Sequence, residues 1–223
     1  PYNLDSFSWK TFRNNPTDVK SLVDNCIYAI SEDSVNQTLW VGTRKGMSLM
    51  DLHNIGSFNS FLPKYSKYVI PCDEVNSLFY DKSGNMWIGS IGGGVYLSEV
   101  QKTGFYAPQI HFFNKNITTL AIRSIYMDSK NNLWVGVGSL GLAVQRSGES
   151  FFQYSKEIPA FKEFGDLGSV YAMEESEPDG AMWFGTFGGG LYCHREGEPI
   201  KRYTSYNSGF IRDNNVYSIF CDA

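Results

Sequence analysis

Few side chains in this sequence stand at the spacings that catalysis or metal binding requires. Three histidines occur, outside any His-Glu-x-x-His motif or other metal-ligating spacing: His53, His111 and His194. His194 directly follows Cys193, but neighbouring residues of a strand point to opposite faces, so this pair cannot serve one site. The four cysteines form no Cys-x-x-Cys pair, and we interpret them as small buried thiols. We therefore expect no metal site.

Acidic residues and glycines give equally little support to an enzyme. The pairs Glu174-Glu175 and Glu196/Glu198 could act as the acids of a glycosidase if they met in space. A solvated loop is the simpler interpretation of both pairs. The glycine clusters precede strand-like segments, which argues against a phosphate loop, and no Gly-x-Ser-x-Gly motif is present. We expect no catalytic residue and no cofactor in this chain.

Aromatic and planar polar side chains favour a binding function instead. A sugar ligand needs an aromatic ring to stack on and planar groups that bond its hydroxyls. Such residues occur where two otherwise repeated phrases of the sequence vary. The candidate ligand-binding residues are Arg44, Lys45, Asn76, Arg123, Tyr171 and Phe187. Tyr28, Ile91 and Tyr217 occupy the same varying positions. Ordinary packing and surface charge are the alternative for each of these residues.

A repeated tryptophan phrase indicates the elements that position these residues. It reads apolar-Trp-apolar-Gly, and its Trp and Gly members are Trp40, Gly42, Trp87, Gly89, Trp134, Gly136, Trp183 and Gly185. The four tryptophans are 47, 47 and 49 residues apart, and only Trp9 of the five in the chain stands outside the pattern. A constant period of this length indicates a repeat architecture.

A second phrase runs ahead of each tryptophan. It reads apolar, any residue, small, apolar, two more residues, then an acid, and its first positions are Ile27, Val75, Ile122, Val170 and Val216. These are 48, 47, 48 and 46 residues apart, so two independent phrases keep the same period. The acids are Asp33, Asp81, Asp128 and Glu175. Each stands at a predicted turn, where a carboxylate can accept backbone N–H bonds.

The repeated residues have mechanical roles in a stack of sheets. Tryptophan is large enough to fill the wedge between two sheets, and the glycine two residues later lets a neighbouring backbone approach closely. Gly92-Gly93-Gly94 and Gly188-Gly189-Gly190 can supply the positive φ that a turn into the next strand requires. We therefore interpret the repeated residues as scaffold, and look for function where the repeats differ.

Each repeat offers four strand-sized segments separated by turn residues; the last segment of the second repeat is 109–113. Lone strands are expected at 6–12 and 215–221. Four short antiparallel strands in a repeat of about 45 residues are typical of a β-propeller blade. The sequence therefore predicts an all-β chain, a partial β-propeller of about four four-stranded antiparallel blades. This would be a fragment of a larger, seven-bladed propeller.

The whole chain, 1–223, is predicted to be one array. Its parts are a blade-junction strand at 6–12, repeats at about 22–68, 69–115, 116–160 and 161–209, and the start of a fifth repeat at 210–223. One lone strand at each end does not complete a ring, so we expect an open arc with exposed blade edges that is prone to self-association.

Composition excludes several function classes. The hydrophobic share of 42% suits a globular chain, while an aromatic share of 16% and 22 glycines favour short strands and tight turns. The net charge is −4 with no basic run, so no nucleic-acid partner is expected. No apolar stretch approaches the ~18 residues that span a bilayer. We expect no membrane contact within this segment.

The segment from Val75 to Val95, with its Asp-x-x-Gly-Asn-Met-Trp-Ile-Gly-Ser core and Gly-Gly-Gly turn, resembles the two-component regulator propeller repeat. The lead-in from Phe12 to Leu22 is also similar to the family's blade junctions. Nearly the whole chain shares the resemblance. It departs from the pattern at Val137 and Ser139-Leu140 of the third repeat, and in a shorter turn, Arg44-Lys45-Gly46, of the first.

The resemblance implies a function. Such repeats build the periplasmic sensor part of hybrid two-component system histidine kinases, which are inner-membrane proteins. It implies detection of oligosaccharides from complex glycans, a homodimeric full-length receptor, and a kinase outside this segment. A free-standing secreted lectin or carbohydrate-active enzyme is the alternative, and an interaction scaffold without a small ligand is a third. Carboxylates gathered at the channel mouth would favour the enzyme.

Overall fold

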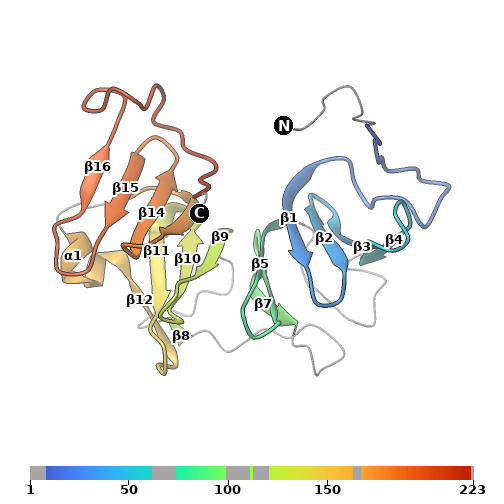
Figure 1. Cartoon of the computed structure of the whole chain (residues 1–223), viewed down its shortest axis with the longest axis horizontal. Helices are drawn as coiled ribbons and strands as arrows, with labels where there is room; N and C mark the ends of the chain where they lie inside the picture. Colours follow the sequence, from blue (N-terminus) through green and yellow to red (C-terminus); the bar gives the residue numbers. More distant parts are fainter. Residues whose placement is uncertain (1–8, 62–73, 99–110, 113–120, 163–166, 222–223) are drawn as a thin grey trace.

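The fold is built from four sheets that stand as successive blades of an arc (Figure 1). The computed structural model describes residues 9–61, 74–98, 111–112, 121–162 and 167–221. In each blade the first strand lies innermost and the following strands pair outward in sequence order, antiparallel to one another. Because consecutive strands are joined by short turns, each repeat can form its own sheet before it packs on the next. The chain is an all-β partial propeller, as predicted.

The first blade contains β1 (Ile27–Asp33), β2 (Thr38–Thr43), β3 (Gly46–Asp51) and β4 (Phe58–Phe61). The second contains β5 (Val75–Tyr80), β6 (Met86–Ser90) and β7 (Gly94–Ser98). The third contains β9 (Ile122–Met127), β10 (Leu133–Val137), β11 (Gly141–Gln145) and β12 (Phe151–Tyr154). The fourth contains β13 (Val170–Ser176), β14 (Ala181–Thr186), β15 (Gly190–His194) and β16 (Lys201–Tyr203). A four-residue helix, α1 (Pro159–Lys162), links the last two blades.

Three predicted strands differ from the structure. The segment expected at 109–113 forms β8 (His111–Phe112), which runs parallel to β12 of the third blade and is not the outer strand of the second. It covers backbone groups at the edge of β12 that would otherwise be unpaired. Residues 9–12 form no strand, and the rest of the range 6–12 lies outside the described residues. Residues 215–221 also form no strand ladder, because no second strand of a fifth blade lies beside them within the described residues.

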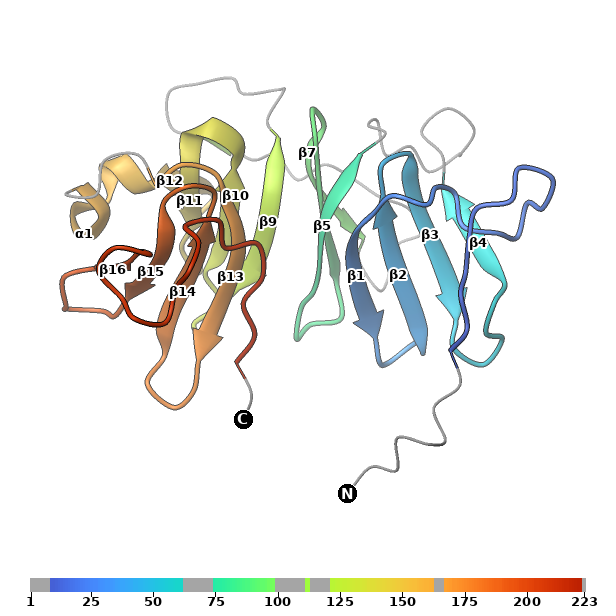
Figure 2. The ribbon, with the colours of Figure 1, turned by 90° about the horizontal axis from the view of Figure 1, so that it is seen from above.

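The innermost strands β1, β5, β9 and β13 lie side by side, and the four blades fan outward from them (Figure 2). The first residues of β5, β9 and β13 each pack against the repeated glycine of the blade before them. An added Cβ on Gly42 would lie 2.8 Å from both Cγ1 and the carbonyl oxygen of Val75. Val216 stands in the same relation to Gly185, so the last segment occupies the place of a fifth inner strand. The repeated glycine sets the spacing between blades.

We predict that Gly136→Ala destabilises the chain by about 2 kcal/mol, because the new methyl group would overlap the backbone carbonyl of Val170 in the next blade. Backbone cannot rotate away as a flexible side chain can. Gly209→Ala is the control, since nothing lies within 4 Å of a Cβ at that position. Urea denaturation followed by tryptophan fluorescence measures both. Equal stability of the two variants would contradict this account of the glycine.

In the first three blades the acid that follows or closes the inner strand, Asp33, Asp81 or Asp128, organises the following turn. In the third blade Asp128 accepts the backbone N–H groups of Lys130 and Asn132 and the side-chain amide of Asn132, at 2.8–3.0 Å. Its Oδ2 also accepts the indole N–H of Trp134 at 2.7 Å. Asp81 and Trp87 repeat this bond in the second blade at 2.8 Å. The acid of one phrase thus orients the tryptophan of the other.

In the fourth blade different residues orient the tryptophan. The indole N–H of Trp183 donates to the hydroxyl of Ser176 at 3.1 Å, and that hydroxyl donates to Asp179 at 2.7 Å. Glu175, the acid predicted for this role, reaches instead to the third blade. Its carboxylate accepts the backbone N–H and the hydroxyl of Ser129 at 2.6 and 2.7 Å. Glu175 therefore connects two blades.

Candidate ligand site in the central channel

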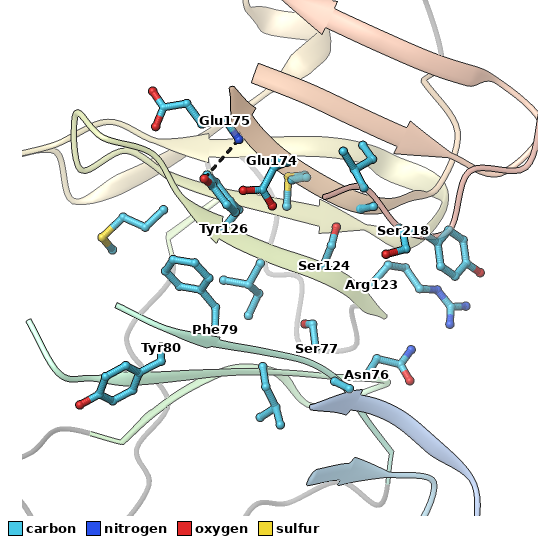
Figure 3. A pocket seen from close by; sticks show the side chains of 18 of the residues that line it. Asn76, Ser77, Phe79, Tyr80, Arg123, Ser124, Tyr126, Glu174, Glu175 and Ser218 are labelled. Carbon is cyan, nitrogen blue, oxygen red and sulfur yellow. Dashed lines mark hydrogen bonds between the residues drawn. The ribbon is translucent and has the colours of Figure 1, made fainter. Parts of the chain in front are cut away.

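The inner strands surround a cavity of about 810 Å³ at the centre of the arc. All four blades contribute residues to its wall, and so does the segment after the fourth blade, through Tyr217, Ser218, Ile219 and Cys221. Figure 3 shows labelled side chains from β5, β9, β13 and this last segment facing the cavity. The volume falls in the range of small-molecule sites, roughly 300–1,000 Å³. The two ends of the cavity differ in chemistry.

One end carries the second residue of each inner strand. Asn76, Arg123, Tyr171 and Tyr217 all line the cavity. The Tyr171 and Tyr217 rings meet edge to face, with centroids 5.3 Å apart. Phe187, on the turn after β14, lies 6.3 Å from both rings. Phe187 is 55% exposed and Tyr217 is 58% exposed, so the cluster presents ring surface to solvent. We call Tyr171, Phe187 and Tyr217 the aromatic cluster.

Arg123 stands beside this cluster, with Cζ 5.5 Å from the centroid of the Tyr171 ring. Its Nε is buried and makes no hydrogen bond, and the same holds for Oδ1 of Asn76 on the neighbouring inner strand. Figure 3 shows the two side chains at the same end of the cavity. A buried donor or acceptor without a partner costs about 1–3 kcal/mol. Neither atom is exposed to solvent, so a ligand forms these bonds once the two side chains turn toward the cavity.

Three predicted ligand residues, Arg44, Lys45 and Phe187, do not line the cavity, although Phe187 adjoins it through its contacts with Tyr171 and Tyr217. The backbone N–H of Arg44 donates to Cys26, as that of Phe187 donates to Ser169, so Arg44 is the counterpart of Phe187 on the first blade. Both cationic side chains lie near Asp24 Oδ2, at 3.6 and 3.5 Å. The structure thus brings Asn76, Arg123, Tyr171 and Phe187 together and gives Arg44 and Lys45 an acidic partner elsewhere on the rim.

The opposite end of the cavity is phenolic and acidic, and the site prediction did not include it. The Tyr126 hydroxyl accepts the backbone N–H of Glu175 at 3.2 Å (Figure 3). Burial raises the pKa of Tyr126 to about 12. Burial also raises the pKa of the Glu174 carboxyl, although a hydrogen bond from Tyr126 opposes that shift. Both residues stand near the ends of their strands, where the repeats also vary. This variation between repeats is the sequence feature that could have identified the two residues.

The stability contributed by Glu174 should depend on pH with a defined sign. Because its folded-state pKa is raised, its contribution is present below the unfolded pKa and is lost as pH rises through the folded value. We expect the stability of the native chain relative to Glu174→Gln to fall as pH rises above about 4, the ordinary pKa of a glutamate. Denaturation of both chains at increasing pH measures the difference.

Glu196→Gln provides a control of opposite sign. A hydrogen bond and charge attraction from Lys130 lower the pKa of Glu196, so its contribution is present above the unfolded pKa and lost as pH falls. The native chain should therefore lose stability relative to Glu196→Gln as pH falls below about 4, the ordinary pKa of a glutamate. If the stability of the native chain relative to Glu174→Gln stays constant or increases with pH, the Glu174 carboxyl does not have a pKa raised by burial in the channel.

His194 and Cys193 lie away from this cavity. Cys193 is buried, and the His194 ring packs against Phe161 with centroids 5.0 Å apart. Burial, aided by the charge of Arg146, lowers the pKa of His194. No group of three or more His, Cys, Asp or Glu side chains that could hold a metal ion occurs among the residues whose positions are described. His194 therefore has a packing role in the fourth blade.

Comparison with known sequences identifies the repeats. Residues 21–45, 70–92 and 116–139 match the sequence model of the two component regulator propeller family. The chain carries two-component regulator propeller repeats, which confirms the resemblance seen in its sequence. The fourth blade lies outside the matched segments, but its strand order and its packed glycine are those of the first. No curated protein matches the sequence.

Solved structures share the fold. The extracellular domain of BT3049 from B. thetaiotaomicron, described as a hybrid two component system, is 21% identical with a TM-score of 0.69, over 98% of this chain and 26% of that one. That of BT4673 from the same organism, described likewise, is 17% identical with a TM-score of 0.68, over 87% and 24%. This chain spans about a quarter of the length of either structure.

The propeller fold of this chain is also similar to that of a protein not described as a two component system. YCF48 bound to a D1 peptide is 13% identical with a TM-score of 0.56, over 92% of this chain and 60% of that one. At such identities the likeness concerns the fold. Within the described ranges, the chain has no helix with the length and apolar character needed to cross a membrane.

Proposed function

We propose that this chain is part of the periplasmic, ligand-sensing region of a two-component signalling receptor. Its repeats match the two component regulator propeller family, and the similar BT3049 and BT4673 structures are extracellular domains of proteins described as hybrid two component systems. The fragment itself is not catalytic in this proposal. It detects a ligand and passes the binding event to a histidine kinase elsewhere in a homodimeric inner-membrane receptor, through a rearrangement between propellers or protomers.

The ligand we propose is an oligosaccharide released from a complex glycan. The observation that carries this proposal is the pairing of exposed rings with unsatisfied polar atoms at one end of the channel. The aromatic cluster offers apolar plates, while Asn76 Oδ1 and Arg123 Nε lack partners beside it. A sugar ring has an apolar face and hydroxyl groups at its edge, so it can use both features at once. Apolar walls with few polar groups are typical of small-molecule sites.

Binding of an oligosaccharide panel to the 223-residue chain tests this proposal by calorimetry. Removal of a ring that anchors a ligand costs about 1–3 kcal/mol, so Tyr171→Ala should weaken the best ligand roughly tenfold or more. Tyr206→Ala is the matched control, because Tyr206 is 92% exposed and does not line the channel. Binding that Tyr171→Ala leaves unchanged, or no binding by any member of the panel, would contradict the proposal.

One observation favours a second candidate, a free-standing secreted lectin or carbohydrate-active enzyme. The Glu174 carboxyl lines the channel, and burial raises its pKa. The general acid of a glycosidase needs a raised pKa. Reducing ends released from the same oligosaccharide panel would identify the enzyme, provided that Glu174→Gln abolishes their release. Binding without turnover supports the sensor. A lectin would differ from a sensor in native cell fractions, where it would be found apart from any membrane-bound kinase.

A further inference from the structure

Among the residues that the structure describes, Arg123 has no acidic partner for its charge. No carboxylate lies within 4 Å of its guanidinium nitrogens in the described part of the chain, although the cationic side chains of Arg44, Lys45 and Arg195 all have one. Arg123 is half-buried in the wall of the cavity, and its Nε reaches neither solvent nor a partner. A half-buried cation held by a ring face alone is incompletely stabilised. An anion in the channel would complete its coordination.

The shape of this cation selects the kind of anion. A guanidinium group presents N–H donors in a planar fork, which matches the two oxygens of a carboxylate. The neighbouring Oδ1 of Asn76 is an acceptor, so the group beside the carboxylate must donate a hydrogen bond. The aromatic cluster adjoins both and requires an apolar face on the same ligand. An inorganic anion such as phosphate offers no apolar face, and a neutral sugar offers no charge.

The distribution of charge along the channel sets the orientation of such a ligand. The end opposite Arg123 is lined by three acids, Glu174, Glu175 and Glu177, and by one cation, Lys82, so its net charge is negative. The carboxylate of Glu175 is already bound by Ser129, so it does not reach back to Arg123. A ligand carboxylate would be repelled from this acidic end and attracted to the other. The two ends therefore favour one direction of binding.

From these observations we propose that the ligand is an acidic oligosaccharide containing a uronic acid residue. Its carboxylate pairs with Arg123, a ring hydroxyl donates to Asn76 Oδ1, and the apolar face of a sugar ring lies on the aromatic cluster. This inference rests on the proposed sensing of oligosaccharides and narrows it to one chemical class. It also explains why a cation stands in the wall of a channel in a chain whose net charge is negative.

The test compares uronic acid oligosaccharides with their methyl esters, which keep the size and the hydroxyls but lose the charge. A panel of galacturonate, glucuronate, mannuronate and iduronate oligosaccharides is titrated into the 223-residue chain, each beside its ester and beside neutral oligosaccharides. For the native chain we expect an acid to bind about 10- to 100-fold more tightly than its ester, the range expected for a charged hydrogen-bonded pair. This comparison requires no variant.

Variants then assign the effect to Arg123. Arg123→Met should remove the preference for the acid over the ester, while Arg123→Lys should retain part of it because the charge remains. Melting curves of both variants show that they fold. Preference for the acid that survives in Arg123→Met would overturn the inference. So would tight binding of neutral oligosaccharides alone, which would leave the proposed function standing. Binding of no oligosaccharide, acidic or neutral, would overturn both.

Discussion

Replacing Trp134 by alanine should lower the free energy of unfolding by about 4 kcal/mol, the largest single loss we expect in this chain. The Trp134 side chain is 2% exposed and lies between the third and fourth blades. Its ring is 5.5 Å from that of Phe184 and 6.2 Å from that of Phe161, and Arg146 stacks on it at 5.7 Å. Alanine would leave a cavity that rigid β-strands on both sides cannot close.

Urea denaturation measures this loss, and Trp9→Ala is its control. Trp9 is 94% exposed, so the same truncation at that position should leave stability nearly unchanged. Trp183 lies between these extremes, half-buried and stacked on Tyr203 at 5.9 Å, and its removal should cost less than that of Trp134. A loss below about 1 kcal/mol for Trp134→Ala would show that the wedge between these blades does not depend on the ring.

Replacing Asp128 by alanine should cost about 3 kcal/mol, because it removes a buried carboxylate that accepts four hydrogen bonds. The backbone N–H of Asn132 and the indole N–H of Trp134 would then be buried without an acceptor. Asp51→Ala is the matched control. Asp51 also accepts a backbone N–H, from His53 at 2.8 Å, but it is exposed to water that can replace it. We expect little change there.

The Asp128 and Trp134 substitutions should not add, since the two side chains share one bond. Trp134→Phe keeps most of the ring and removes only the indole N–H. In a double-mutant cycle, Asp128→Ala should be less destabilising in the Trp134→Phe background than in the native chain. Strict additivity in this cycle would mean that the carboxylate stabilises the turn without orienting the tryptophan, and would contradict the link we infer between the two repeated phrases.

The blades could be predicted from sequence because each repeat forms its sheet from adjacent segments. Strand pairing such as β13 with β14 follows from a short turn and a local apolar pattern. The segment at 111–112 could not be placed in this way, because its partner β12 belongs to another repeat. Residues 216–219 carry the apolar part of the inner-strand phrase, yet a ladder also needs a neighbouring strand. Local patterns predict where strands can form; the partner decides which of them do.

Part of the candidate site followed from the repeat as well. Equivalent positions of successive repeats lie at equivalent places around the axis, so Asn76, Arg123 and Tyr171 reach the same end of the channel. Arg44 shares the equivalent turn, but its ion pair with Asp24 is a tertiary contact that spacing does not reveal. Tyr126 was not singled out, and the interpretation of Glu174 and Glu175 as a solvated loop was wrong, because both lie on β13 and line the channel.

Hydrogen exchange with and without the tightest-binding oligosaccharide of the panel tests the central claim, that the ring-lined end of the channel is where this chain binds its ligand. The account predicts slower exchange at the beginnings of β5, β9 and β13 and in residues 214–218, with no change in the outer strands β4, β12 and β16. Protection confined to those outer strands, with unchanged exchange along the channel, would contradict the claim and place the site on the outer surface of the arc.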